Sequence, residues 1–339
     1  MQAYRFTIQP LSAFGTPLAG DTLFGQLCWT LRHQLGNDRL NALLGGYTNG
    51  KPFAVISDAL PAGHVPLPSV PSSLWAASSD TDRKLLKKKL WLPSTALAEN
   101  FPEWQARARS DADVARASVV DCNDCQGQAS ARSDTNVALQ TERAQPHNTI
   151  SRQSGTTGEG MFAPYAMPQI WFHPAVLFDL YVVLDDARLT LAELTAALDS
   201  MGATGFGRDA SIGLGKFRRV EDAAVANWPV VTNANSYLTL GPCAPQGQDY
   251  CPERSFYQVV TRFGRHGDVA VQFGNPFKRP VLMAKAGSVF WPEVPDPARL
   301  FVGQGLGGLN SPVSLAMPET VQQGYAPVIA FHRPVEASA

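Results

Sequence analysis

Gly202-Ala-Thr-Gly-Phe-Gly-Arg-Asp-Ala-Ser-Ile-Gly-Leu-Gly-Lys216 is the stretch of this sequence that says most about its fold. Four apolar side chains recur before it at helical spacing: Leu191, Leu194, Leu198 and Met201. They predict a helix that begins near Thr190 and ends at Gly202. The residues after the stretch, 217–220, are typical of a strand. Because glycine permits positive φ and close backbone approach, and successive N–H groups in such a turn can bind an anion, the stretch predicts an anion-binding turn between helix and strand.

Nucleotide-binding motifs do not fit this Gly-rich loop. Counting back from Gly215-Lys216, a phosphate-binding P-loop would need glycine where Ala210 stands and serine or threonine where Phe217 stands. The P-loop also joins a strand to a following helix, whereas here a helix comes first. The dinucleotide motif G-x-G-x-x-G ends wrongly after Gly205-Phe-Gly207. What remains is an anion-binding turn or a plain Gly-rich connector.

The charge of the chain requires that any nucleic-acid site be local. Among 339 residues the net charge is −1 and the pI is about 6.6, so no overall basic field attracts nucleic acid. Four cations accompany the Gly-rich loop: Arg208, Lys216, Arg218 and Arg219. Only 17% of residues are charged, which favours a protein inside an assembly or, alternatively, a monomer with long loops.

Cysteine content and termini give expectations about compartment and metal. The odd number of cysteines, the lack of a signal-peptide pattern at Met1 and the absence of about 20 consecutive apolar residues predict a cytoplasmic protein with reduced thiols and no membrane span. Cys122-Asn-Asp-Cys125 has the spacing of half a zinc site or of a redox pair. The nearest further ligand, His147, is over twenty residues away, so incidental or structural thiols are favoured, and no cofactor is expected.

The rest of the chain divides into two α+β halves. A strand at Tyr4–Ile8 precedes a loop and a helix that Asp21 would cap and that ends near Gly36. Residues 106–146 are polar and predict a weakly packed insertion. The segment His147–Arg152, a Gly-rich turn at 155–160 and Met161–Tyr165 predict a hairpin. From about Tyr237 a new set of strand-like segments begins, which gives halves 1–225 and 226–339.

Three motifs support a resemblance to a known family. The pattern Gly-x-Gly-x-x-x-Ser-x-Gly-x-Gly-Lys-Phe at 205–217, between helix and strand, resembles the signature loop of RAMP proteins, the ferredoxin-like RNA-binding family of CRISPR systems. The segments 15–25 and 147–158 are similar to those of the Csm subunit that caps the 5′ end of the guide RNA in type III-A complexes. The resemblance extends from the first strand to about residue 220, and the insertion matches no family.

The resemblance implies a fold and a function. The expected fold is α+β with two ferredoxin-like (RRM-like) domains: 1–225, with the Gly-rich loop, the hairpin and an insertion at about 96–165, and 226–339, a degenerate second copy. The implied function is that of a non-catalytic subunit that binds the 5′ handle of CRISPR RNA (crRNA). Such a subunit also bridges the large polymerase-like subunit to the backbone filament subunit. The equivalent subunit of a type III-B complex is an open alternative.

The resemblance also implies RNA-binding residues. In the Gly-rich loop and the strand that follows it, these are Gly205, Gly207, Arg208, Ser211, Gly213, Gly215, Lys216 and Arg218. Thr16 and Asp21 would lie beside this loop, and His147, Asn148, Thr149 and Arg152 on the hairpin would arrange splayed bases. Handle phosphates would meet the loop N–H groups, Ser211 and Lys216. In the second half, Lys278, Arg279 and Lys285 are either a further patch or ordinary surface charge.

A catalytic alternative depends on His147. Some RAMP relatives cut RNA without metal, and such a mechanism needs a general base within hydrogen-bond reach of the 2′-hydroxyl and an acid for the leaving oxygen. Of the six histidines, His147 is the best candidate because it lies in a motif, although a stacking or hydrogen-bonding contact to RNA is favoured. The alternative function is therefore a metal-independent endoribonuclease that processes precursor crRNA.

Overall fold

The computed structural model describes residues 1–76, 83–121, 137–272 and 274–334. The helices and strands of its first domain follow one another in a ferredoxin-like order. Its strands and helices follow in the order β1 (Gln2–Pro10), α1 (Gly20–Leu35), β2 (Ala54–Ile56), β9 (Phe178–Leu184), α7 (Leu191–Thr204) and β10 (Phe217–Arg219). The strands form one antiparallel sheet in the order β10-β1-β9-β2, so this β-α-β-β-α-β arrangement confirms the α+β prediction for the first half. Two short strands extend the sheet: β3 (Leu60–Pro61) pairs with β9, and β11 (Ala224–Val225) pairs with β1.

Helix α7 begins where the sequence predicts and ends two residues beyond the predicted end. The Thr190 hydroxyl accepts the Glu193 N–H at 3.2 Å, and the Glu193 carboxylate accepts the Thr190 N–H at 2.8 Å, which is a capping box. The predicted end at Gly202 is wrong, because the helix continues to Thr204 and Gly205 caps it. Gly202 instead lets α7 pack directly on β10, since a Cβ there would lie 2.2 Å from the carbonyl oxygen of Phe217.

Helix α1 also shows a small correction. It begins at Gly20, with Ala19 as the N-cap residue, so Asp21 lies inside the first turn and does not cap the helix. The Asp21 carboxylate is buried and pairs with Arg262, which accounts for the difference. The predicted end near Gly36 is confirmed. Helix α2 (Asn37–Leu44) and the 3₁₀ turn η1 (Tyr47–Asn49) follow.

The core of the first domain lies between its sheet and its helices. It includes fully buried side chains from β1, α1, β9 and α7: Phe6, Ile8, Leu23, Leu27, Leu31, Leu180, Val182, Leu194 and Met201. Fully burying a side chain of this size contributes about 1.5–3 kcal/mol. The Tyr325 ring, from the second half, closes the same core and packs edge-on against Tyr47.

Between β3 and β9 the chain leaves the first sheet and forms a lobe and a hairpin. The lobe has a small sheet in the order β4 (His64–Pro66), β5 (Lys89–Pro93), β6 (Arg109–Ser110). Its helices are α3 (Arg83–Leu86), α4 (Trp104–Arg107) and α5 (Asp111–Asp121), with 3₁₀ turns η2 (Ser72–Leu74), η3 (Ser94–Ala98) and η4 (Phe101–Glu103). The rings of Phe101 and Trp104 pack on Phe331 of the second half, which fixes the lobe on the body.

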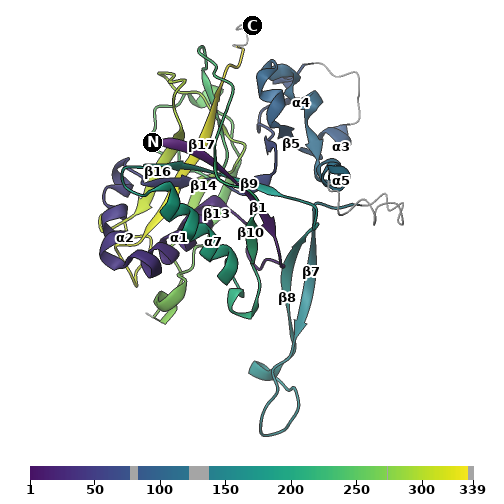
Figure 1. Ribbon diagram of the computed structural model, residues 1–339, viewed down its shortest axis with the longest axis vertical. Coiled ribbons are helices and arrows are strands. Elements are labelled where there is room, and N and C mark those ends of the chain that lie inside the picture. The colour runs from purple at the N-terminus through teal and green to yellow at the C-terminus, as the bar shows by residue number, and fades with distance from the viewer. Residues whose placement is uncertain (77–82, 122–136, 273, 335–339) are drawn as a thin grey trace.

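The predicted hairpin is present, but its strands are displaced from the predicted positions. Strands β7 (Gln140–His147) and β8 (Tyr165–Phe172) pair over eight residues and project from the body (Figure 1). The segment 148–164 joins them and includes the 3₁₀ turn η5 (Gly160–Phe162), so only His147 of the predicted strand 147–152 is in a strand. Almost every residue of β7 is exposed, so the two-residue hydrophobic period that identifies a strand in a sequence is absent.

The second half is a β structure without the predicted ferredoxin-like order. Its main sheet runs β15 (Val289–Phe290), β12 (Ser236–Thr239), β17 (Val321–Phe331), β16 (Phe301–Gly307). Across 226–272 and 274–334 the other elements are strands β13 (Val259–Arg262) and β14 (Val281–Ala284) and 3₁₀ turns η7 (Pro252–Arg254) and η8 (Asp268–Gln272), with no α-helix. A second ferredoxin-like domain is therefore not confirmed, and the boundary at 225/226 stays a prediction.

Several polar contacts join the two halves, among them those of Arg262, Gln323 and Tyr325. Arg262 on β13 donates to the Asp21 carboxylate at 2.6 and 2.9 Å. The Gln323 side chain on β17 accepts the Ile56 N–H and donates to the Ile56 carbonyl, both at 2.8 Å, as a neighbouring strand would. The Tyr325 hydroxyl donates to the Tyr47 carbonyl at 2.6 Å. These contacts place α1 against β17 and beside the β13–β14 ribbon (Figure 1).

Asp58 makes stability depend on pH. Burial raises the pKa of its carboxyl to about 7, an effect that Asp21 adds to and that the Gly20 N–H, donated at 2.8 Å, and Arg262 oppose. Because this folded-state pKa lies above the unfolded value, the stability contribution is complete below about pH 4 and is lost as pH rises to about 7.

We expect Asp58→Asn, which keeps an acceptor for Gly20, to remove up to a few kcal/mol of this pH dependence. Urea unfolding of both proteins at pH 5 and pH 8 measures it, and identical slopes with pH would contradict the assignment.

Within the described residues, no helix combines the length and the apolar character needed to cross a bilayer. Cys122 and Cys125 lie outside the described residues. Among the residues that are described, no group of three or more His, Cys, Asp or Glu side chains could hold a metal ion.

Candidate nucleic-acid interface

The Gly-rich loop connects α7 to β10 and is built on left-handed backbone. Gly205, Gly207, Gly213 and Gly215 have φ of 101°, 76°, 98° and 74°, and Asp209 has φ of 65°. Asp209 precedes the single 3₁₀ turn of the loop, η6 (Ala210–Ile212). A Cβ at Gly205 would lie 2.4 Å from the Leu214 carbonyl oxygen, so the glycines also fold the loop closely onto itself.

Most N–H groups of the loop are used inside the protein. Eight of the twelve N–H groups at 205–216 donate to protein acceptors. Among them are Gly205 to Met201 O, Gly213 to Ala210 O, Gly215 to Ala13 O and Lys216 to Ser12 Oγ, at 2.7–3.0 Å. These N–H groups are thus engaged within the protein, and the binding of phosphate by the loop stays a prediction. The N–H groups of residues 207 and 209–211 make no hydrogen bond to other described residues, and the exposed Ser211 side chain lies among them.

Thr16 and Arg208 attach the loop to its neighbours. Thr16 Oγ1 accepts the Arg208 N–H at 2.9 Å, and a Cβ at Gly207 would lie 2.6 Å from the Thr16 Cβ. The Arg208 guanidinium donates to the Pro168 carbonyl of β8 at 2.5 Å and pairs with Asp209 at 3.2 Å. Phe14 and Ile170 exchange two backbone hydrogen bonds beside it. The loop, the segment 12–16 and the base of the hairpin thus form one surface.

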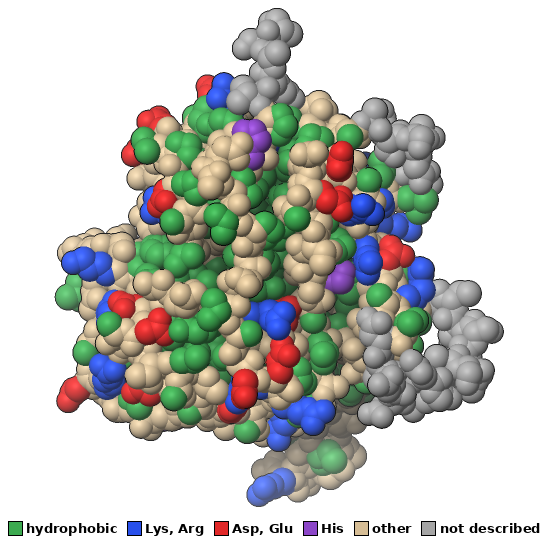
Figure 2. All heavy atoms as spheres, turned by 45° about the horizontal axis from the view of Figure 1, so that its top comes forward, with side chains coloured by type: hydrophobic (Ala, Val, Ile, Leu, Met, Phe, Trp, Pro, Cys, Tyr) green, Lys and Arg blue, Asp and Glu red, His purple; other side chains and the backbone are tan. Residues whose placement is uncertain are grey.

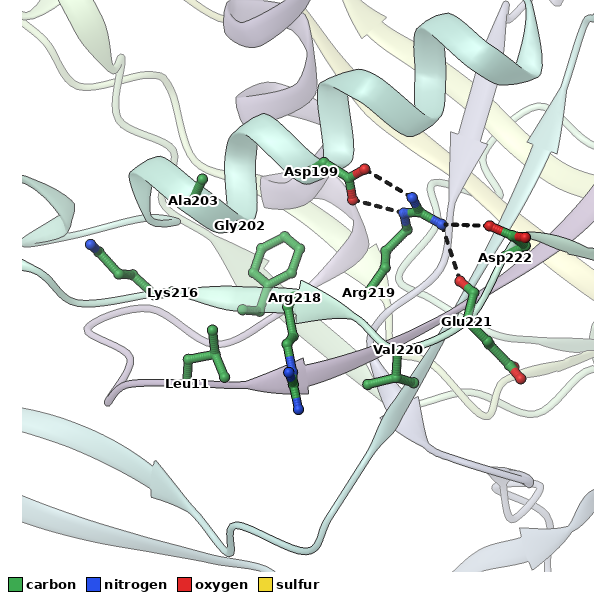
Figure 3. Close-up of a pocket in the computed structure, with 11 residues that line it drawn as sticks. Leu11, Asp199, Gly202, Ala203, Lys216, Arg218, Arg219, Val220, Glu221 and Asp222 are labelled. Carbon is green, nitrogen blue, oxygen red and sulfur yellow. Dashed lines mark hydrogen bonds and ion pairs between the residues drawn. The ribbon is translucent and has the colours of Figure 1, made fainter.

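Of the four cations near the loop, two face solvent without a carboxylate partner. Lys216 is exposed, and the exposed Arg218 donates to Gln9 Oε1 at 2.8 and 3.0 Å. Arg219 lies between Asp199, at 2.7 Å, and Asp222, at 3.8 Å (Figure 3). These side chains line an open groove of about 690 Å³ between the end of α7 and β10. In it, Lys216 and Arg218 point away from the acidic group around Arg219 (Figure 3).

The hairpin residues lie on a separate part of this surface. The His147 ring stacks on Tyr165 with centroids 5.3 Å apart and an interplanar angle of 13°. Tyr165 is half exposed and lies three residues from Pro168, or about 10 Å along the strand. Asn148, Thr149 and Arg152 are exposed in the segment after β7, toward the outer end of the hairpin (Figure 1). The structure therefore brings Thr16 to the Gly-rich loop but does not bring these three residues to it.

Asp21 does not belong to the exposed surface. Its side chain is 6% exposed, and both carboxylate oxygens accept from Arg262. Sequence reasoning missed three partners of the site. Ser12 accepts the Lys216 N–H, and Gln9 accepts from the Arg218 guanidinium. Tyr165 stacks on His147. No signal in the sequence pairs Ser12 with Lys216 or Gln9 with Arg218, because these partners are distant along the chain. His147 and Tyr165 are closer and pair across the hairpin.

The charge distribution agrees with a local site. On the face shown in Figure 2, acidic and basic side chains are mixed among apolar ones, and basic side chains are most frequent beside the lobe that carries α3–α5. The lobe supplies exposed Lys87, Lys88 and Arg109 there. A single strand of nucleic acid would therefore meet isolated cations and not a continuous basic groove.

The first domain is ferredoxin-like and carries a Gly-rich loop between its second helix and its last strand, where the resemblance to RAMP proteins predicts it. Along almost its whole length the chain is similar to chains of solved type III-A CRISPR-Cas structures. One belongs to the crystal structure of a Csm3–Csm4 subcomplex in the type III-A interference complex, with a TM-score of 0.56, 14% identity and coverage of 98% of this chain and 100% of that chain.

Two further similar chains come from crystal structures of a Csm1–Csm4 cassette. The cassette in complex with cA4 gives a TM-score of 0.55 at 14% identity, and the cassette in complex with pppApA gives 0.53 at 13% identity. Each match covers 98% of this chain and 99% of the other. No protein-family model and no curated protein matches the sequence. At this identity the likeness shows a shared fold.

Proposed function

We propose that this chain is the non-catalytic, crRNA-binding subunit of a type III-A (Csm) CRISPR-Cas effector complex. It holds the 5′ handle of the crRNA and bridges the large polymerase-like subunit to the backbone filament subunit. The single observation that carries the proposal is the meeting of two of the motifs with the base of the hairpin in a RAMP fold. The Gly-rich loop, the segment around Thr16 and the base of the hairpin come from distant parts of the sequence and lie in contact.

The chemistry of this surface suits a single-stranded, phosphate-bearing ligand. Lys216 and Arg218 offer charge without a competing carboxylate, and the N–H groups of residues 209–211 are available to an anion. The half-exposed Tyr165, already stacked on His147, offers an aromatic face to an unpaired base. Cations fix the backbone and rings hold bases, which is the usual division of roles in single-strand binding.

The fold likeness supports the partner assignment. Chains of this fold occur in structures of Csm3–Csm4 and Csm1–Csm4 assemblies, and we extend association with such subunits to this protein. The low share of charged residues agrees with a surface that other subunits cover. Pull-down of tagged protein with co-expressed large and filament subunits tests the bridge, which requires that both are retained together.

The proposal also states that the chain does not cut RNA. His147 is engaged in an aromatic stack, and no acidic side chain of the described part of the chain pairs with it, so its contact with RNA is a binding contact. Incubation of the purified protein with repeat-containing RNA in EDTA tests this. Intact RNA is expected, whereas cleavage that His147→Ala abolishes would establish the endoribonuclease instead.

Lys216→Ala combined with Arg218→Ala is expected to lower handle affinity roughly tenfold at moderate salt and to flatten its salt dependence. If each side chain neutralises one phosphate of a single strand, the slope of log affinity against log salt concentration becomes less negative by about 1.4, or about 0.7 for each side chain. Filter binding at several salt concentrations measures both quantities.

A matched control removes two other exposed lysines, Lys87 and Lys88 on the lobe, by Lys87→Ala with Lys88→Ala. This variant changes the net charge equally and is expected to keep the affinity and slope of the unmodified protein. Equal effects of the two double variants would mean that only net charge matters, and would remove the loop from the site.

A further inference from the structure

The outer face of the β13–β14 ribbon carries an exposed row of large apolar side chains. Five of them define this outer ribbon face, with exposed fractions of 50–75%: Tyr257, Val259, Phe263, Phe277 and Leu282. Tyr257, Val259 and Phe263 are separated by even numbers of residues, Leu282 pairs across the ribbon with Thr261, and Phe277 forms a bridge with Arg265. Alternation in an antiparallel pair places such residues on one face.

The inner face of the ribbon is packed, so this exposure does not reflect a loosely held segment. Met283 is 1% exposed, and Arg262 is held by Asp21 and by the Thr22 hydroxyl at 3.0 Å. Beside the ribbon, Cys243 and Ala284 form an isolated bridge, which ties β14 to the segment that follows β12. The outer ribbon face is therefore a rigid platform with an unpartnered surface.

One cation, Arg265, lies among the rings of this platform, and two further exposed cations flank β14. Arg265, Arg279 and Lys285 are exposed and have no acidic partner among the described residues. The Arg265 guanidinium lies over the Phe277 ring, 5.7 Å from its centroid. The nearest acid along this segment, Asp268, is occupied by His33. On a chain of net charge −1, this is a local excess of positive charge.

The ribbon lies beside the segment that leads to the candidate interface. Arg262, which directly precedes Phe263, binds Asp21 and Thr22 at the start of α1. The same short segment begins with Thr16, which binds the Gly-rich loop. A strand held at the loop would reach the ribbon by crossing the start of α1.

We infer that the outer ribbon face is a second contact surface for single-stranded RNA, continuous with the handle site. This inference rests on the proposed function, which identifies RNA as the ligand. Exposed rings on a sheet surface stack on bases of any sequence, and arginine beside them binds phosphate and stacks in turn. A protein partner would also cover the apolar side chains. Arg265, which lies over the Phe277 ring and has no carboxylate partner among the described residues, favours the polyanion.

Phe263→Ala combined with Phe277→Ala tests the inference. Both side chains are more than 60% exposed, so the variant retains the fold. The probe is a fluorescein-labelled single-stranded RNA with the repeat sequence of the same locus followed by guide nucleotides, and anisotropy gives the affinity. Affinity is expected to fall at least tenfold, because each base stacked on an aromatic ring contributes about 1–3 kcal/mol. The control, Val230→Ala with Val294→Ala, removes two apolar side chains that are 87% and 83% exposed elsewhere and is expected to leave affinity unchanged.

The Lys216→Ala/Arg218→Ala variant, measured in parallel, separates this inference from the proposed function. If it loses affinity while the phenylalanine variant does not, the handle site stands and the ribbon contact is overturned. If only the phenylalanine variant loses affinity, the ribbon contact stands and the loop is not the handle site. If the phenylalanine variant keeps RNA affinity but no longer retains a co-expressed Csm subunit, the face is a protein interface and the inference is wrong.

Discussion

Gly215→Ala is expected to destabilise the protein by about 3 kcal/mol or more and to abolish the Gly-rich loop as a defined structure. Gly215 has φ of +74°, and an added Cβ would lie 2.1 Å from the Phe206 carbonyl oxygen and 2.5 Å from the Phe206 nitrogen. Both atoms are backbone, so no side-chain rotation relieves the contact. The Gly215 N–H also donates to Ala13, so displacement separates the loop from the segment 12–16. Urea unfolding followed by tryptophan fluorescence measures the loss.

Gly213→Ala separates the effect of steric overlap from that of left-handed backbone. Gly213 has φ of +98°, but nothing lies within 4 Å of the position that its Cβ would take. Left-handed backbone alone costs a residue with a Cβ about 1–2 kcal/mol, so a smaller loss is expected. Equal losses for the two variants would show that the close approach at Gly215 is unimportant and that the loop is a loose connector.

Arg262→Met is expected to destabilise the protein by about 2–4 kcal/mol, since it leaves the Asp21 carboxylate buried without its partner. Asp21 is 6% exposed in its side chain and lies near Asp58, whose neutral form burial favours. Adding Asp21→Asn removes the stranded charge and is expected to restore much of the loss. A double-mutant cycle by urea unfolding gives the coupling between the two residues.

A surface ion pair serves as the control for this cycle. Arg107 pairs with Glu99 at 2.9 Å, but its side chain is 63% exposed. Arg107→Met is expected to leave stability nearly unchanged, because solvent screens exposed pairs. If Arg262→Met were equally harmless, the ion pair would not hold the ribbon against α1.

Local patterns were enough to predict the first domain. The leucine spacing of 191–201 identified α7, and the glycine composition of 202–215 placed a turn between a helix and a strand. The strand at Tyr4–Ile8 and the helix that ends near Gly36 were predicted for the same reason: their periodicity depends only on neighbours along the chain. The resemblance then supplied the order in which these elements form a sheet.

The remaining features depend on contacts between distant residues. The sequence predicts that Asp21 caps a helix, but its partner Arg262 is 241 residues away, and no local pattern indicates the pair. The glycine-rich residues 303–307 lie in strand β16. Glycine is needed at 305 because a Cβ there would lie 2.5 Å from the Tyr47 carbonyl oxygen. The hydrogen bonds of the Gly215 and Lys216 N–H groups arise in the same way, since Ala13 and Ser12 accept from residues about 200 positions later.

The candidate site was thus predictable in its position and less so in its chemistry. Composition located the loop and its cations, but it could not separate Arg219, neutralised by Asp199, from Lys216 and Arg218, which face solvent. The resemblance assigned the hairpin residues to the same RNA site, whereas the length of β7 and β8 carries Asn148 and Thr149 away from the loop. Side-chain partners and strand length decide both points, and neither can be read from residue type.

The Gln323 side chain, which bonds both backbone groups of Ile56, has a consequence for how the protein behaves at high concentration. Strand β2 ends the first sheet, and an end strand with free N–H and C=O groups recruits strands from other molecules. Gln323 occupies these groups from within the same chain. A protein made in excess of its partners is thereby protected against edge-to-edge aggregation, and losing one amide group would expose it to self-association before it unfolds.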